Sequence, residues 1–235
     1  MTKLSPRLQT LAGLVPMGAS VADIGTDHAY LPIYLVEQGV ALRAIGSELN
    51  PGPYQAAQKA VAGVNLTEHI DIRRGNGLET IKPGEVDTVV IAGMGGGTIT
   101  EILGNHQDVL DHVQRLILQP MIGSAQLRSW LIKQGWSIVA EDLVEDEHRI
   151  YEVIVAEPGP TTNIDEIILE IGPRLLATGH PLLARHLHRI IEGETKVIRE
   201  LGKSTQPEAI SKARELEVKV EQIRELVWCR LQLKI

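Results

Sequence analysis

Two aspartates flank a single glycine in residues 23–32 (DIGTDHAYLP). This stretch follows a short apolar run and opens a helical pattern, which predicts a strand, a tight turn and the start of a helix. Gly25 has no Cβ, so a ligand can approach the backbone there. Phosphate-binding turns present bare N–H groups to an anion and avoid acids, whereas this turn contains Asp23 and Asp27. A cationic or zwitterionic ligand fits better, and S-adenosylmethionine, with its amine, sulfonium and adenosine, is such a ligand.

Two further polar side chains follow the next strand patterns. Glu48 ends a pattern over 42–47, and an acid at this place in a doubly wound sheet binds the hydroxyls of a ribose. The alternative is a polar strand end before a helix cap. Asn76 stands between two glycines after a third short pattern, where its amide suits an adenine edge, although Asn-Gly is also an ordinary turn. We include the adjacent Leu49 and Gly77 in the predicted cofactor site.

A continuous apolar run over 88–92 predicts a central strand buried on both faces. It leads into the glycine-rich segment 93–97, which resembles a dinucleotide fingerprint but has Thr98 where the third glycine is required. This difference disfavours an NAD-dependent dehydrogenase. We predict instead a floor of small residues where the reactive end of the cofactor meets a flat acceptor. The floor is the run 93–97, and Ala92, Gly93 and Met94 belong to the predicted cofactor site. Gln119 and Pro120 at the next strand end are predicted substrate contacts.

The remaining patterns of the front part predict one helix and one hairpin. Leucines spaced as in an amphipathic helix over 4–14 indicate a first helix that begins at Ser5-Pro6. Strand patterns over 136–140 and 150–156 flank the acidic segment 141–148. They predict a β-hairpin that completes the sheet. We expect its acidic segment to be exposed to solvent rather than to bind a metal.

The pattern changes after residue 157, where strand signals end and two long helical patterns follow. Each has an apolar stripe with steps of three and four, which predicts an antiparallel helical hairpin of coiled-coil type. The stripes are Leu183, Leu187, Ile190, Val197 and Leu201 in the first helix, and Ala213, Leu216, Val220, Ile223 and Val227 in the second. We therefore divide the chain into domains 1–157 and 158–235. Arg185 and Arg189 either meet phosphates or belong to a solvated face.

Composition excludes several classes of protein. No apolar run approaches the roughly 20 residues that span a bilayer, and the N-terminus lacks the apolar stretch of a signal peptide. Cys229 is the single cysteine and cannot form an internal disulfide, which fits a reducing cytosol. We expect a cytoplasmic monomer with no membrane and no metal partner. The net charge of −7 argues against a nucleic-acid partner. From residue 160 onward, however, the chain has 12 Lys and Arg and 11 Asp and Glu, so this part is about neutral and the charge leaves the question open.

The run Asp23-Ile24-Gly25-Thr26-Asp27-His28-Ala29-Tyr30-Leu31-Pro32 closely resembles the signature of a bacterial tRNA methyltransferase family, TrmK. That family methylates N1 of the adenine at tRNA position 22 with S-adenosylmethionine. The likeness continues through 5–8, 75–78, 91–96, 116–120 and 151–153, so it covers roughly residues 4–157. Asn76 departs from the family, which usually has Asp there, but an amide oxygen can still accept from the adenine amine.

The resemblance implies an α/β protein with a Rossmann-like class I methyltransferase domain, built on a seven-stranded and mostly parallel sheet. It also implies a C-terminal helical, coiled-coil-like domain that contacts tRNA, with S-adenosylmethionine as the cofactor. Carried over by position, Asp23, Gly25 and His28 lie along the methionine part, Glu48 holds the ribose, Asn76 and Gly77 hold the adenine, and Gly93 and Met94 line the reaction pocket. Thr26 and Leu31 complete the predicted cofactor set.

Asp27 is the candidate catalytic residue. N1 of adenine is a neutral nitrogen with an in-plane lone pair, so methyl transfer needs orientation and negative potential rather than a base. A carboxylate near N1 and the exocyclic amine supplies both, and Asp27 leaves the turn at the methyl end of the cofactor, with Tyr30 as a stacking face. The alternative for Asp27 is a helix N-cap.

Two other functions fit the same cofactor site. A small-molecule methyltransferase shares the site but needs no long helical tail. A non-catalytic cofactor-binding protein would use the tail as an oligomerisation arm.

Overall fold

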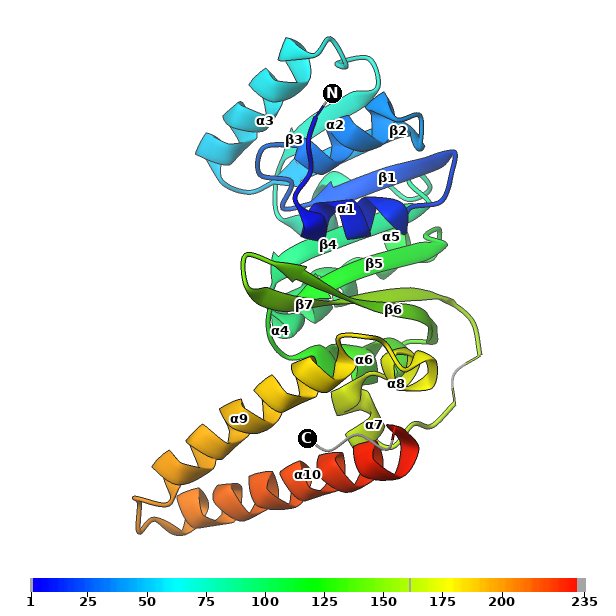
Figure 1. Ribbon diagram of the computed structural model, residues 1–235. Helices are drawn as coiled ribbons and strands as arrows, with labels where there is room; N and C mark the ends of the chain where they lie inside the picture. The colour runs from blue at the N-terminus through cyan, green and yellow to red at the C-terminus, as the bar shows by residue number, and fades with distance from the viewer. Residues whose placement is uncertain (1, 161, 232–235) are drawn as a thin grey trace. The chain divides into compact units, whose positions relative to one another are not determined.

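The computed structural model describes residues 2–160 and 162–231, with side chains as far as residue 226. The chain forms two compact units, Met1–Asn163 and Ile164–Ile235, whereas the sequence patterns change after residue 157. The first unit has a sheet with helices on both faces, and in its described residues the second unit contains helices and no strand (Figure 1).

Seven strands form one sheet in the order β3-β2-β1-β4-β5-β7-β6. They are β1 (Ala19–Ile24), β2 (Ala41–Glu48), β3 (Ile70–Arg74), β4 (Thr88–Met94), β5 (Arg115–Pro120), β6 (Trp136–Asp146) and β7 (Arg149–Pro158). Neighbouring strands from β3 to β5 are parallel, and β7 is antiparallel to both β5 and β6. The predicted seven-stranded, mostly parallel sheet is confirmed.

Helices cover both faces of this sheet. Those of the first unit are α1 (Pro6–Gly13), α2 (Tyr30–Glu37), α3 (Pro51–Gly63), the 3₁₀ helix η1 (Gly77–Thr80), α4 (Gly96–Gly104), α5 (Gln107–Leu110) and α6 (Ser124–Lys133). Residues of α1, α2 and α3 pack on one face, and residues of α4, α5 and α6 pack on the other. The helix α1 begins as predicted, because Ser5 Oγ accepts a hydrogen bond from the Leu8 amide and Pro6 follows the cap.

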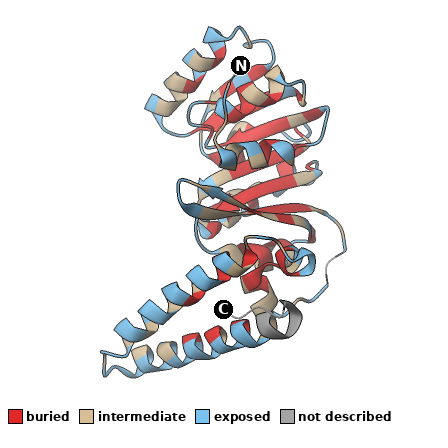
Figure 2. Ribbon diagram, viewed as in Figure 1, coloured by how far each residue is buried: buried red, intermediate tan, exposed pale blue. Residues whose placement is uncertain are grey.

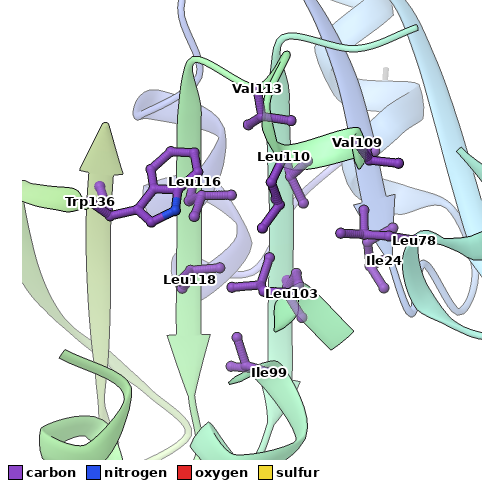
Figure 3. Packing of buried hydrophobic residues seen from close by; sticks show 14 of the residues in the cluster. Ile24, Leu78, Ile99, Leu103, Val109, Leu110, Val113, Leu116, Leu118 and Trp136 are labelled. Atoms are coloured by element: carbon purple, nitrogen blue, oxygen red, sulfur yellow. The ribbon is translucent and has the colours of Figure 1, made fainter. Parts of the chain in front are cut away.

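The central strands are apolar on both faces because each face is covered. In β4, Val89 and Ile91 pack with the α4–α6 layer, and Val90 between them packs with the α1–α2 layer. Figure 3 shows Leu116 and Leu118 of β5 packed near Leu103 of α4 in the first of these layers. Figure 2 shows these strands as largely buried, which holds their ends in fixed positions.

The β6–β7 hairpin is confirmed, but its acidic segment is not a loop in solvent. The strand β6 continues to Asp146, and only Glu147 and His148, with φ of 46° and 64°, separate it from β7. Glu141 is buried and its Oε1 lies 2.6 Å from Nε of Arg128 on α6. The prediction of an exposed segment was wrong at Glu141 because the cation that allows its burial lies on a different element.

The second unit consists of α7 (Glu166–Ile171), α8 (Pro173–Thr178), α9 (Leu183–Leu201) and α10 (Pro207–Leu231). The predicted pair of long helices is confirmed. The buried stripe positions of α10 are Leu216, Val220 and Ile223. The α9 stripe is only partly right, since Ile191 is buried rather than Ile190, and Val197 is 46% exposed. The side chain of Val227 lies outside the described residues.

Candidate active site at the strand ends

The strand order reverses between β1 and β4, since β1 continues to β2 and β3 on one side while β4 continues to β5 on the other. Loops at such a reversal separate and leave a crevice outside the carboxyl ends of the parallel strands. The predicted site residues of the first unit lie at the carboxyl ends of β1, β2, β3, β4 and β5 or follow them. The topology therefore brings them to the same edge of the sheet.

A cavity of about 430 Å³ opens at this edge. It is lined by Lys3, Ser5, Arg7, Leu8, Asp23, Gly25, Thr26, Asp27, His28, Tyr30, Leu31 and Ala92. All eight lining residues from Asp23 onward were predicted site residues. The four that precede them come from the N-terminal segment and were missed as site residues, although three of them lie in the run 5–8 of the family likeness.

The glycine turn is tied to the end of β2. The amides of Gly25 and Thr26 both donate to the carbonyl of Ser47, at 2.8 and 3.1 Å. Gly25 has a φ of 74°, and the non-glycine residues Asp27 and Ala29 also have positive φ values, 51° and 55°. Positive φ costs a non-glycine residue energy, and such residues gather at functional sites. The φ of 74° favours glycine at position 25, and a Cβ built there would also lie 2.5 Å from Cε of Met94, at the end of a flexible side chain that would have to move.

Asp27 does not cap a helix. The N-cap of α2 is Ala29, and no side chain satisfies the first amides of that helix. The Asp27 side chain is 65% exposed and its Oδ1 lies 3.6 Å from Nε2 of His28. The ring of His28 is stacked on that of Tyr30, with centroids 5.4 Å apart. The alternative role as a cap was wrong, and the carboxylate instead faces the open side of the cavity beside two rings.

Asp23 is a buried acid at the bottom of this turn. Its side chain accepts a hydrogen bond from Thr26 Oγ1 at 2.7 Å, and the residue is 7% exposed. Burial raises the pKa of Asp23 to about 6, against the effects of the Thr26 hydrogen bond and the positive charge of Arg7, and the charge of Glu48 adds to the rise. A positively charged group beside Asp23 would remove the penalty of burying its charge.

Glu48 joins the second strand end to the turn. Its Oε1 accepts the amide of Asn50 at 2.9 Å, and its Oε2 accepts the amide of Asp27 at 3.3 Å. The carboxylate is thus held at the β2 tip and is largely buried, and its contact with a ribose stays a prediction. Asn76 is exposed at the β3 tip, directly before Gly77, whose carbonyl accepts from Ser47 Oγ at 2.9 Å. These groups and the 56% exposed Leu49 continue the site beyond the cavity lining.

Arg7 reaches from α1 to the ends of β4 and β5. Its Nη1 donates to Oε1 of Gln119 at 2.8 Å, and the same oxygen accepts the amide of Gly93 at 3.1 Å. The guanidinium also lies over the ring of Tyr151, 5.4 Å from its centroid. Gln119 is fully buried, and its Nε2 donates to the carbonyl of Pro120. Gln119 therefore positions Arg7 and Gly93, and direct substrate contact by Gln119 and Pro120 stays a prediction.

Arg185 and Arg189 lie in the second unit, on one face of α9, and both are exposed. Their phosphate contacts stay a prediction. Within residues 2–160 and 162–231, no group of three or more His, Cys, Asp or Glu side chains is arranged to hold a metal ion. In the same part of the chain, every helix is too short or too polar to cross a bilayer.

Comparison with known proteins shows the family of this chain. The model of the tRNA (adenine(22)-N(1))-methyltransferase family matches residues 21–225. The Bacillus subtilis (strain 168) enzyme of that name is 38% identical over 231 residues, which cover 96% of this chain and 97% of its own.

Solved structures agree with the sequence match. The crystal structure of the B. subtilis m1A22 tRNA methyltransferase TrmK has a TM-score of 0.89 at 35% identity, and 97% of this chain and 100% of that chain are covered. A Streptococcus pneumoniae protein in complex with S-adenosyl-L-methionine has a TM-score of 0.83 at 36% identity, with 96% and 100% covered. The resemblance in the sequence motifs is thus confirmed over nearly the whole chain, and the protein belongs to the TrmK family of tRNA (adenine(22)-N(1))-methyltransferases.

Proposed function

We propose that the site at the strand ends transfers the methyl group of S-adenosylmethionine to N1 of the adenine at position 22 of tRNA, with Asp27 beside the reacting base. Family membership makes the protein a methyltransferase of tRNA that uses S-adenosylmethionine. The observation that supports the residue assignments is the buried Asp23, whose pKa is raised to about 6 next to a bare glycine turn in a cavity at the strand-order reversal. Such an acid is suited to receive an ammonium group.

The residues around the cavity fit the parts of the cofactor. Asp23 accepts hydrogen bonds from the ammonium group of the methionine part. Arg7 and Lys3 line the same cavity and supply the positive charge that the carboxylate of the methionine part requires. Glu48 binds the ribose hydroxyls from the end of β2. Asn76 and Gly77 hold the adenine, with an amide oxygen where the family usually has a carboxylate, and Gly93 and Met94 border the reaction pocket.

When bound, S-adenosylmethionine supplies a methyl group on a positively charged sulfur. The attacking N1 is neutral, so the protein needs no general base there. Asp27 accepts a hydrogen bond from the exocyclic amine of the adenine and thereby orients N1. Its negative charge also stabilises the positive charge that grows on the ring as the methyl is transferred. The stacked rings of His28 and Tyr30 offer the flat face against which the base rests.

A kinetic comparison tests the role of Asp27. We expect Asp27→Ala to reduce kcat for tRNA methylation by about 100-fold, the typical effect of removing one preorganised charge-stabilising group. The dissociation constant for S-adenosylmethionine, measured by calorimetry, should change less than about threefold. The control is Asp108→Ala, which removes an exposed acid in the first turn of α5. Equal losses of turnover and of cofactor affinity in Asp27→Ala would assign this residue to the cofactor site instead.

The second unit contacts tRNA phosphates in this proposal. Arg185 and Arg189 share one face of α9, as a track along a phosphate backbone requires. The double substitution Arg185→Ala/Arg189→Ala should raise KM for tRNA and reduce the slope of log affinity against log salt by about 2. Cofactor affinity should not change. An unchanged salt slope would show that these arginines belong to a solvated face.

The decisive experiment for the reaction uses unmodified tRNA and labelled S-adenosylmethionine, followed by mapping of the methylated nucleotide. Methylation at N1 of adenine 22 supports the proposal, and label in a small molecule but not in tRNA contradicts it. The proposal places this reaction in the cytoplasm, with a monomeric enzyme. Sedimentation at several protein concentrations tests the monomer.

A further inference from the structure

Four large apolar side chains are exposed around the active-site edge of the first unit. Tyr30 and Leu49 follow β1 and β2, and Met121 and Ile122 directly follow β5. Their exposed fractions are 50%, 56%, 42% and 75% in that order. An exposed group of apolar side chains beside a site for a large substrate marks a contact surface.

The two residues after β5 are held rigidly. The amide of Met121 donates to the carbonyl of Met94 at 2.8 Å, and the carbonyl of Ile122 accepts the amide of Gly96 at 2.8 Å. The next residue, Gly123, has a φ of 75° and packs closely on Gly96. A Cβ built on Gly96 would lie 2.5 Å from the carbonyl oxygen of Gly123. Isoleucine is also stiff about its first side-chain torsion. Ile122 is therefore an exposed apolar side chain in a fixed direction.

Ile122 lies next to the reaction pocket. Its Cγ1 would be 3.7 Å from a Cβ built on Gly95, which directly follows Met94 at the end of β4. The pocket border at Gly93 and Met94 and the exposed side chain of Ile122 therefore belong to one continuous piece of surface.

We propose that Met121 and Ile122 form a wedge that enters the base stack of the tRNA and fills the space left by the target adenine. This inference rests on the proposed function. N1 lies on the Watson–Crick edge of adenine, so a stacked and paired base must turn out of the RNA before its N1 is accessible. Proteins that open a base stack commonly insert isoleucine, methionine or leucine between neighbouring bases. The turned-out base then meets Tyr30 and Asp27, which line the cavity at the same edge of the sheet.

The size of the patch favours RNA over a second copy of this chain. Stable protein–protein interfaces involve about 20–30 residues on each side, whereas this rim has four large apolar side chains. The gap left by one base accommodates one or two side chains, which matches Met121 and Ile122.

The test combines Ile122→Ser with two companion variants. Ile122→Leu restores an apolar side chain at the same position, and Met17→Ser removes a 76% exposed methionine from the loop before β1, at the opposite edge of the sheet. Single-turnover methylation is measured on two RNAs, the folded unmodified tRNA and the same transcript with an abasic site opposite the target adenine. A third transcript with 2-aminopurine at the target position reports unstacking through its fluorescence.

We expect Ile122→Ser to methylate folded tRNA at least about tenfold more slowly, because turning out a stacked base has a substantial energetic cost. Its rate on the abasic transcript should stay within about threefold of the wild type, and the 2-aminopurine signal should fall. Ile122→Leu and Met17→Ser should behave as the wild type.

Three results would overturn the wedge. These are wild-type rates for Ile122→Ser on folded tRNA, an equal loss on both RNAs, and a change in the sedimentation of Ile122→Ser, which would point to a second copy as the occupant. Failure of the proposed function gives a separate result, namely a wild-type protein that is inactive on both RNAs.

Discussion

The first unit buries two acids in contrasting ways. Glu141 on β6 is buried against the guanidinium of Arg128, which is itself fully buried and also pairs with Glu152. Asp23 at the end of β1 has a neutral partner, the hydroxyl of Thr26, and in the described part of the chain no cation lies within ion-pair distance of it. The first acid is neutralised by the fold, whereas burial of the second raises its pKa to about 6.

This difference separates a structural acid from a ligand-binding one. Removing an ion pair from water is expensive, so a buried pair needs close geometry and further hydrogen bonds. The Arg128 cluster meets this need with contacts to both carboxylates and a hydrogen bond from Ser124 Oγ to Glu152 at 2.7 Å. At Asp23 the fold leaves the compensation to a cation from outside, which we assign to the ammonium group of S-adenosylmethionine.

The largest effect is expected where the structural pair is broken. Arg128→Met leaves Glu141 buried without its cation, and the free energy of unfolding should fall by about 3–5 kcal/mol. Urea denaturation at pH 7.5 measures this loss. Lys133→Met on the same helix is the control, since Lys133 is the last residue of α6 and is exposed, and it should change stability by less than about 0.5 kcal/mol. Similar values for the two variants would show that the buried cluster does not stabilise the fold.

The opposite effect on the free energy of unfolding is expected at Asp23, where removal of the charge should stabilise the protein. Below about pH 3, Asp23 is protonated in both the folded and the unfolded protein, so Asp23→Asn and the wild type should be equally stable. Between about pH 4 and 6 the unfolded chain loses this proton more readily than the folded protein, because the pKa is about 6 when folded against 3.8 ordinarily, so the wild type loses stability across this range and the loss is complete above pH 6. Above pH 7, Asp23→Asn should therefore be more stable by up to about 3 kcal/mol without cofactor. A variant that is less stable than the wild type at pH 8 would contradict this.

Cofactor affinity should follow the same ionisation. Below pH 6 a proton must leave Asp23 before the ammonium group can bind, so the dissociation constant for S-adenosylmethionine should rise by about fivefold between pH 6 and 5. Calorimetry between pH 5 and 7 tests this expectation. Asp23→Asn serves as the control, and its weaker binding should lack this pH dependence. An identical slope in the variant would assign the titration to another group.

The smallest effect is expected from the neighbouring acid. The charge of Glu48 contributes to the raised pKa of Asp23. The wild type and Asp23→Asn differ in free energy of unfolding by an amount that changes with pH, and this change has a midpoint. When Glu48→Gln is added to both proteins, the midpoint should move to lower pH by less than about one unit, because the charge of Glu48 no longer raises the pKa of Asp23. Urea denaturation of the four variants as a function of pH measures this midpoint. A shift to higher pH would show that Glu48 acts on Asp23 by some route other than its charge.

Local patterns predicted most of the fold. The apolar runs before Gly25 and Gly93 became β1 and β4, and Ser5-Pro6 became the start of α1. These predictions succeeded because strand burial, caps and glycine turns depend on residues that are neighbours in sequence. The seven-stranded, mostly parallel sheet was predicted from family resemblance rather than from the residues themselves, and its strand order was not predicted.

Contacts between distant residues were not predictable in the same way. Arg7 reaches Gln119, 112 residues away, and Arg128 meets Glu141 from another element. Periodicity alone also did not decide which residue of α9 is buried at one position of the stripe. Ile190 and Ile191 are adjacent, and packing in the folded protein buries Ile191. The chemical role of a side chain such as Arg7 becomes visible only when its partners are known.

The position of α1 matters for anyone who makes this protein. Residues 3–8 supply one wall of the cofactor cavity through Lys3, Ser5, Arg7 and Leu8. A purification tag joined directly to the N-terminus would be separated by only two residues from Lys3 of that lining, so tags belong at the C-terminus or before a cleavable linker. A product translated from an internal start at Met17 would keep every strand of the sheet, yet its pocket would be open on one side.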